Sequence, residues 1–91
     1  MYRYWGGNIG SNVRIFQGVT IGLKKHQGEY PTIGNNVILH AGSMALGNVT
    51  IWNNARIVAG SVVLSDVPSN CVAVGIPAKI KKRYNELILI T

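Results

Sequence analysis

The chain repeats a pattern of hydrophobic and polar positions every six residues. Nearly every unit begins with a large aliphatic residue, and Ala45 is the exception. The first positions are Ile9, Ile15, Ile21, Ile33, Leu39, Ala45, Ile51, Ile57 and Val63. A six-residue period does not match the spacing of an amphipathic helix, and the frequent Val and Ile favour extended structure. We therefore predict short extended rungs that wind into a β-helix.

Two other positions of the unit predict corners between the rungs. The fourth position always holds Asn, Gly or Asp, the residues that adopt a left-handed backbone at least cost. These residues are Asn12, Gly18, Asn36, Gly42, Asn48, Asn54, Gly60 and Asp66. The fifth position holds a smaller residue, which suits the tight space behind a corner. These residues are Val13, Val19, Val37, Ser43, Val49, Ala55, Ser61 and Val67.

Two segments interrupt the repeat and define the organisation of the chain. We expect residues 1–78 to form the β-helix domain, with residues 23–31 extruded from one corner as a loop. Residues 79–91 form a basic C-terminal tail. The spacing of Ile80, Tyr84, Leu87 and Ile88 is helical, but residues 87–90 also read as a strand. The tail is predicted to be a short helix or an extended cap on the coil.

Composition narrows the possible partners and locations. The 91 residues suffice for one small domain with a net charge of +6, and Lys79, Lys81, Lys82 and Arg83 are close together. Such an excess suits an anionic partner, or simply a solvated tail. Cys71 is the single cysteine, so no internal disulfide and no thiolate metal cluster can form. No apolar run is long enough for a membrane span, and no secretory signal is recognisable.

Several motifs resemble the hexapeptide-repeat acyltransferases. They are IFQGVTIG at residues 15–22, PTIGNNV at 31–37, AGSVVL at 59–64 and VGIPAK at 74–79. Within that family the chain looks most like the serine acetyltransferases and the polysaccharide O-acetyltransferases. The resemblance covers about residues 7–82.

The resemblance implies a fold and a reaction. The fold is a left-handed parallel β-helix of triangular section, an exception to the usual right-handed crossover. Members are usually homotrimers with active sites in clefts between subunits. Acetyl-CoA donates the acetyl group, and the small-molecule acceptor is a hydroxyl of serine or of a sugar. The residues that match the family's cofactor-binding positions are Gly42, Gly60, Ser61, Gly75, Pro77, Ala78 and Lys79.

Acetyl transfer to a hydroxyl needs a general base. Alignment on residues 16–22 places the family's histidine base a few residues upstream of Met1, so we expect an N-terminally truncated chain without turnover of its own. His26, in the expected loop, is the candidate base. His40 stands where relatives usually have Gly and is expected at an outer corner. A zinc site of the carbonic-anhydrase-like type requires three histidines, and with two present no metal is expected.

Bulky residues replace Gly at several second positions of the repeat. They are Phe16, His40, Trp52 and Val58. We expect such exposed side chains to narrow a groove or to form subunit contacts. The leading prediction is a cytoplasmic O-acetyltransferase with no nucleic-acid or membrane partner. The alternative is a non-catalytic trimeric scaffold, or a remnant that binds CoA.

Overall fold

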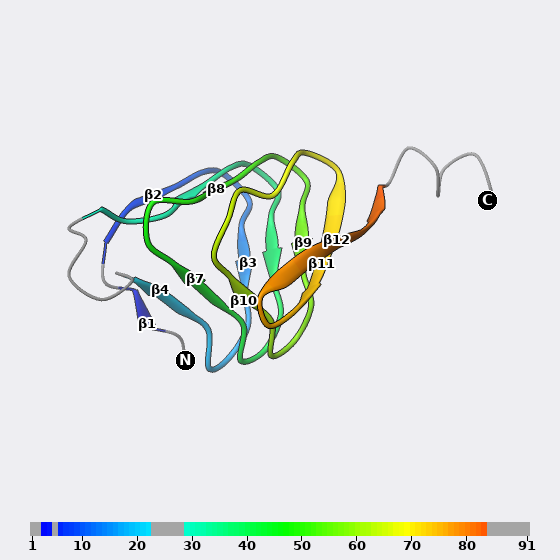
Figure 1. The fold of residues 1–91 in the computed structure, drawn as a ribbon. Helices are drawn as coiled ribbons and strands as arrows, with labels where there is room; N and C mark the ends of the chain where they lie inside the picture. The colour runs from blue at the N-terminus through cyan, green and yellow to red at the C-terminus, as the bar shows by residue number, and fades with distance from the viewer. Residues whose placement is uncertain (1–2, 5, 23–28, 84–91) are drawn as a thin grey trace.

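A computed structural model of the chain describes residues 3–4, 6–22 and 29–83. This part of the chain consists of short strands in three sheets and contains no helix, hence none that could cross a membrane (Figure 1). Sheet A contains β1 (Arg3–Tyr4), β4 (Thr20–Gly22), β7 (Met44–Leu46) and β10 (Val62–Val63). Sheet B contains β2 (Asn8–Ile9), β5 (Thr32–Ile33) and β8 (Thr50–Ile51). Sheet C contains β3 (Arg14–Ile15), β6 (Ile38–Leu39), β9 (Arg56–Ile57), β11 (Cys71–Gly75) and β12 (Ala78–Arg83).

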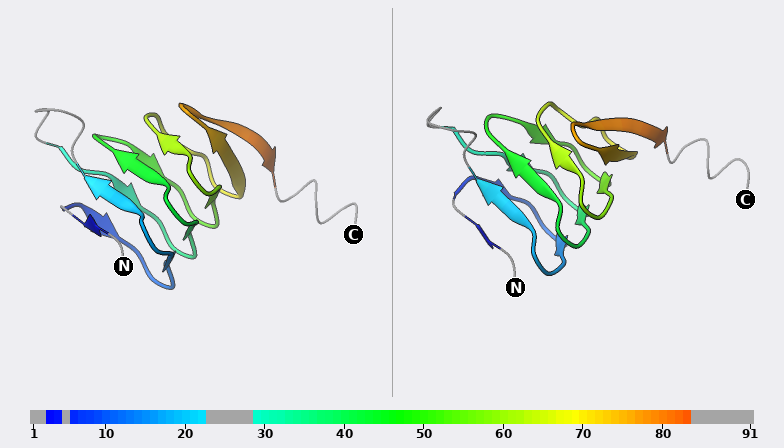
Figure 2. Two further views of the ribbon diagram at one scale, coloured as in Figure 1. Left: turned by 90° about the horizontal axis from the view of Figure 1, so that it is seen from below. Right: turned by 60° about the horizontal axis from the view of Figure 1, so that its bottom comes forward.

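Successive strands enter successive sheets, so the chain is a parallel β-helix with three sides. From β2 onward the order is sheet B, sheet C, sheet A, and then sheet B again. Each strand pairs in parallel with the strand above it in the next coil, as β5 does with β8. Figure 2 shows the coils stacked along one axis, from β1 to the β11–β12 hairpin at the other end. The prediction of extended rungs in a coil is confirmed.

The length of one coil follows from the strand register. Thr32 pairs with Thr50, so that coil consists of three repeat units. Asn8 pairs with Thr32, four units further along the chain, and the extra unit includes residues 23–28. Thr20 and Met44 pair across the same four units, so all strands stay in phase across this segment. Of the expected loop 23–31, residues 23–28 lie outside the described residues, whereas Pro31 is buried.

The first and fifth positions of the repeat form the core of the coil. Every first position from Ile21 to Val63 and every fifth position from Val19 to Val67 is buried. Ile9, Val13 and Ile15 in the first coil are only partly buried and pack against this core. Since successive strand residues point to opposite faces, a six-residue repeat keeps one side chain of each strand inside.

The corner between sheets B and C is a column of asparagines. Asn12, Asn36, Asn54 and Asn70 have φ angles between 56° and 64°, in the left-handed region. The backbone N–H of Asn36 donates to the carbonyl of Ser11 one coil below, at 2.8 Å, and the same bond recurs at Asn54 and Asn70. Left-handed backbone is accessible to Asn because its short polar side chain bonds locally. These corners therefore stack by main-chain hydrogen bonds.

The corner between sheets A and B departs from the prediction. Asn48 and Asp66 are not among the residues with positive φ, and Gly47 has a φ of 81° instead. The N–H of Gly47 donates to the Gly22 carbonyl at 2.9 Å, and the Gly47 carbonyl accepts from Val49 N–H at 2.8 Å. The second bond closes a tight turn around Asn48. The left-handed residue therefore lies one position earlier than the repeat predicts.

The repeat also changes phase near the end of the coil. We predicted Val67 as a fifth-position residue, but it pairs with Ile51, at a spacing two residues short of three repeat units. Val72 pairs with Arg56 at the same shortened spacing. The last corner of sheets A and B is therefore two residues shorter than the preceding one. Val67 takes the inward place of a first-position aliphatic as a result.

The coil ends in an antiparallel hairpin. β12 pairs with β11, with a register shift between Val72 and Ala73, and covers the edge of sheet C. Of the two alternatives for the tail, residues 78–83 adopt the extended one. Ala78 packs against the core, while Lys79 and Lys81 are exposed. Residues 84–91 lie outside the described residues.

Candidate functional site

The corner between sheets C and A is a column of glycines. Gly18, Gly42 and Gly60 have φ angles between 72° and 74°. The N–H of Gly42 donates to the Gln17 carbonyl, and that of Gly60 donates to the Ala41 carbonyl, each at 3.0 Å. The predicted cofactor residues Gly42 and Gly60 thus lie one above the other. Their N–H groups are engaged within the coil.

Backbone conformation alone does not require glycine at this corner. Asn36 and Asn54, at the other end of the sheet C strands, hold φ angles of 58° and 64° with a side chain in place. A Cβ built on Gly60 would meet no atom within 4 Å, so the space outside it is open. Glycine therefore adds a surface of bare backbone, which is what close approach of a ligand requires.

A second column of larger side chains borders the glycines. Phe16, His40 and Val58 each follow a sheet C strand, and the rings of Phe16 and His40 lie 5.2 Å apart at 34°. Phe16 is 43% exposed, whereas His40 and Val58 are half-buried. His40, expected at an outer corner, thus stacks on Phe16 beside Ala41 and Gly42. Trp52, the fourth bulky substitution, lies at the opposite corner and is 51% exposed.

Ser61 points into the molecule. Its side chain is 1% exposed, and its Oγ accepts a 3.0 Å hydrogen bond from Gly75 N–H. Its own N–H donates to the Val58 carbonyl at 3.1 Å, and its carbonyl accepts from Met44 N–H at 2.8 Å. These bonds give Ser61 a structural part that the sequence did not predict. They also attach the glycine corner to the β11–β12 turn.

That turn carries the other predicted cofactor residues. Gly75 has a φ of 106°, the Ile76–Pro77 peptide bond is cis, and Ile76 is 75% exposed. Ala78 is half-buried, and Lys79 is exposed and pairs with Val74. The Ser61–Gly75 bond brings the turn next to Gly60. The structure thus gathers the predicted cofactor residues at one end of one corner, while His26 lies outside the described residues.

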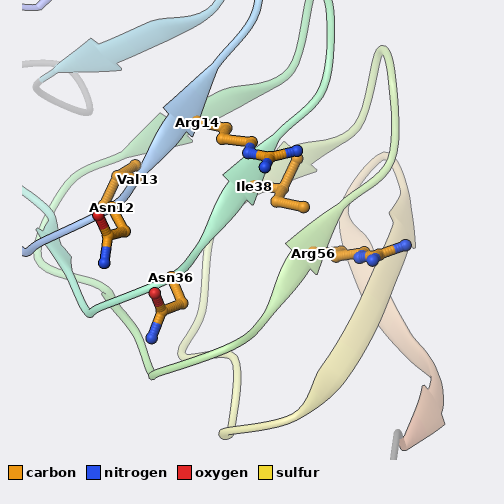
Figure 3. A pocket seen from close by; sticks show the side chains of 6 residues that line it. All are labelled: Asn12, Val13, Arg14, Asn36, Ile38 and Arg56. Atoms are coloured by element: carbon orange, nitrogen blue, oxygen red, sulfur yellow. The ribbon is translucent and has the colours of Figure 1, made fainter.

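Sequence reasoning missed two further features. Ser43 lies one coil below Ser61 and is equally buried, but its Oγ finds no hydrogen-bond partner among the described residues. A hollow opens on the outer face of sheet C (Figure 3). It is lined by Asn12, Val13, Arg14, Asn36, Ile38 and Arg56. The signal for it was present, since Arg14, Ile38 and Arg56 each precede a first-position aliphatic.

Potential metal ligands do not cluster in the described part of the chain. No group of three or more His, Cys, Asp or Glu side chains there could hold a metal ion. The described carboxylates, Glu29 and Asp66, precede β5 and Val67 and so lie away from the glycine corner. The Oδ1 of Asp66 accepts a 2.8 Å bond from Thr50 N–H.

The six-residue repeat of this chain matches that of a known protein family. The model of the bacterial transferase hexapeptide (six repeats) matches residues 30–65. Residues 30–65 thus carry the hexapeptide repeat of this transferase family. Serine acetyltransferase of Synechococcus elongatus is 51% identical over 74 residues, covering 79% of this chain and 30% of the relative. That of Staphylococcus epidermidis is 52% identical over 82 residues, covering 88% of this chain and 38% of the relative.

Solved structures of serine acetyltransferases share the fold of this chain. Serine acetyltransferase from Brucella abortus in complex with coenzyme A has a TM-score of 0.79 at 30% identity, covering 85% of this chain and 40% of that one. The Neisseria gonorrhoeae enzyme in complex with serine has a TM-score of 0.78 at 45% identity, covering 84% and 31%. The predicted left-handed parallel β-helix is confirmed. The chain spans only about a third of the length of these relatives.

Proposed function

We propose that this chain takes part in acetyl-CoA-dependent O-acetylation of a small-molecule hydroxyl, with serine as the acceptor and a sugar hydroxyl as the alternative. The likeness to serine acetyltransferases, including structures with coenzyme A and with serine bound, supports this reaction. The relatives extend well beyond the matched part. The reaction of the whole protein is therefore proposed for this chain on the strength of the shared β-helix.

The observation that carries the proposal is the bare glycine corner. Asn at the opposite corner tolerates nearly the same left-handed backbone, yet this corner keeps Gly18, Gly42 and Gly60. We place the pantetheine arm of the donor along this column. At its end the exposed Lys79 offers an ammonium group to the donor's phosphates. Gly75, Pro77 and Ala78 hold that lysine at the start of β12.

A corner supplies one wall of a cleft, and a second subunit would supply the other. We therefore propose a homotrimer, as the family resemblance implies. We also propose that it acts in the cytoplasm. Phe16 and Met44 are exposed on or beside sheet A, and Ile76 is exposed at the end of the glycine corner. Apolar side chains of this size fit a subunit contact better than water.

The reaction requires a general base on the protein. When bound, the donor supplies an activated acetyl thioester. The acceptor hydroxyl attacks the carbonyl carbon while a base takes its proton, and CoA leaves as the thiol. We propose His26 as that base. His40, half-buried against Phe16, lies in a corner that contains neither of the described carboxylates, so no carboxylate there orients it.

The same features also fit a second function, binding of CoA without turnover. A module that binds CoA without turning it over needs the glycine corner and Lys79 but no base. The position of His40 favours this alternative over a second catalytic site. Binding and turnover must therefore be measured separately.

The test of the donor site compares two corners. Gly60→Asn keeps a residue that accepts a φ of 74°, but it places a side chain on the open backbone. We expect CoA affinity, measured by isothermal titration calorimetry, to fall at least about tenfold, the loss of roughly one good polar or apolar contact. Asn36→Gly, at the opposite corner, is the matched control and should leave affinity unchanged. Equal CoA binding by Gly60→Asn and the parent chain contradicts the proposed site.

A further inference from the structure

The strand register of sheet C aligns basic and aliphatic residues alternately across the sheet. Strand register aligns Arg14 with Ile38, Ile38 with Arg56, Arg56 with Val72, and Val72 with Lys82. One residue comes from each of β3, β6, β9, β11 and β12. We call these five positions the sheet C row. None of them has a part in the site proposed above.

The spacing of the sheet C row is fixed by the sheet. Neighbouring strands lie about 4.8 Å apart, so its basic positions recur about every 9.6 Å and the row is about 19 Å long. Arg14 and Arg56 are exposed, and Ile38 between them is half-buried. Figure 3 shows the Arg14 side chain reaching toward Ile38, whereas the Arg56 side chain extends away from the other residues that line the hollow. The row thus offers a cation, an apolar recess and a cation in sequence.

Charge is segregated around the coil. Lys79 and Lys81 add two exposed ammonium groups on β12 of the same sheet. The described carboxylates are on other sides, since Glu29 and Asp66 precede segments that pair in sheet B. A face with one sign of charge attracts and orients a partner of the opposite sign.

We propose that the sheet C row docks an acidic amphipathic α-helix of a partner protein, lying along the axis of the coil. In a helix, residues i, i+7 and i+14 lie on one stripe about 10.5 Å apart, and residues i+3 or i+4 lie about halfway between them. Acidic residues on that stripe meet Arg14 and Arg56. Apolar residues between them meet Ile38 and Val72. About 13 residues of helix span the row.

The alternation selects this partner over other anions. A phosphodiester chain or a lipid headgroup layer presents negative charge but no apolar group in register with Ile38 and Val72. Apolar anchors between charged pairs are also the pattern by which helices bind grooves.

The direct test uses a designed probe. A fluorescently labelled, alanine-rich peptide of about 18 residues carries Glu at i, i+7 and i+14 and Leu at i+3, i+4, i+10 and i+11. Its anisotropy is titrated with the full chain at low salt. We expect saturable binding that a peptide of the same composition in shuffled order does not show. Equal binding of the shuffled peptide overturns the proposal.

Variants separate the row from net charge. Arg14→Gln and Arg56→Gln should each weaken peptide binding about threefold, and together about tenfold, as expected for surface ion pairs. Thr32→Glu, exposed on sheet B, changes the net charge by the same amount as Arg14→Gln and should have little effect. An equal loss with Thr32→Glu means attraction by overall charge and contradicts the proposal.

A variant at Ile38 distinguishes binding of a helix from binding of a generic polyanion. Ile38→Thr keeps a β-branched residue but removes the apolar recess, and it should weaken the peptide while leaving binding of an oligothymidylate unchanged. An unaltered peptide affinity in Ile38→Thr, or tighter binding of oligothymidylate than of the peptide, overturns the helix and assigns the row to nucleic acid. Thermal unfolding of each variant confirms that it is folded.

Discussion

The backbone N–H of Gly75 donates a 3.0 Å hydrogen bond to Oγ of Ser61, a side chain that is 1% exposed. Gly75 closes β11, whereas Ser61 follows the last glycine corner of the coil. One core hydroxyl therefore fixes the turn that carries Pro77 and Lys79 against Gly60. The proposed donor site depends on this contact without the hydroxyl touching the donor.

Ser61→Ala should destabilise the chain. The substitution leaves the half-buried Gly75 N–H without its acceptor, and this should cost up to about 1–3 kcal/mol, the upper value holding for a fully buried group. Guanidinium unfolding followed by tryptophan fluorescence, at fixed protein concentration because assembly affects the midpoint, measures the change. CoA affinity should fall as well, since the turn loses its anchor. An unchanged free energy of unfolding means that this bond contributes nothing in solution.

Ser43→Ala is expected to act in the opposite direction. Its hydroxyl is equally buried but has no partner among the described residues. Removing an unsatisfied hydroxyl relieves its desolvation, and the gain should be up to about 1 kcal/mol after allowance for the small space left behind. The same unfolding experiment compares the two serines under one chemical change. A loss equal to that of Ser61→Ala indicates that Ser43 Oγ is bonded in solution.

Alanine should destabilise the chain more at Gly34 than at Gly60, although only Gly60 has a positive φ angle. A Cβ on Gly34 would lie 2.9 Å from Asn53 N and 3.0 Å from the carbonyl carbon of Trp52, so the next coil has to shift. Gly34→Ala should cost about 2–3 kcal/mol through overpacking. Gly60→Ala meets open space and should cost about 1–2 kcal/mol for its left-handed backbone. The reverse order in thermal unfolding contradicts the close stacking at Gly34.

Any acetyl transfer by the 91-residue chain should depend on His26. Release of CoA thiol from acetyl-CoA in the presence of serine is the assay. His26→Ala should lower a measurable rate by about 10²- to 10⁴-fold, the usual contribution of a general base. His40→Ala, the matched control, removes the ring contact with Phe16 and should leave the rate nearly unchanged. CoA binding without any thiol release supports the binding module instead.

Much of this fold was predictable because each six-residue unit places the same types of residue at the same positions. Ile21, Leu39 and Ile57 recur at the same phase and are all buried. The corners at Asn36 and Gly42 follow from residue types that tolerate left-handed backbone. A pattern of this kind depends only on local conformation and on burial. Both are visible in the residue type at each position.

The departures arise where the coil changes its local geometry. Gly47 replaces Asn48 as the left-handed residue because the turn there closes with a bond to Val49. Val67 changes phase because its corner is two residues shorter, which a fixed period cannot register. The bond of Ser61 and the sheet C row depend on which coils lie side by side. Neither can be seen until the register is known.

The register also bears on how such chains diversify. The coil between Asn8 and Thr32 is one repeat unit longer than the coil between Thr32 and Thr50, yet both pairs belong to one continuous sheet. The corner after β4 therefore accepts added length without disturbing the strands on either side. A loop inserted at this place adds new side chains beside the coil and leaves the strand register unchanged. Insertion at this corner is therefore a route by which one β-helix can gain new surface side chains without a change in strand register.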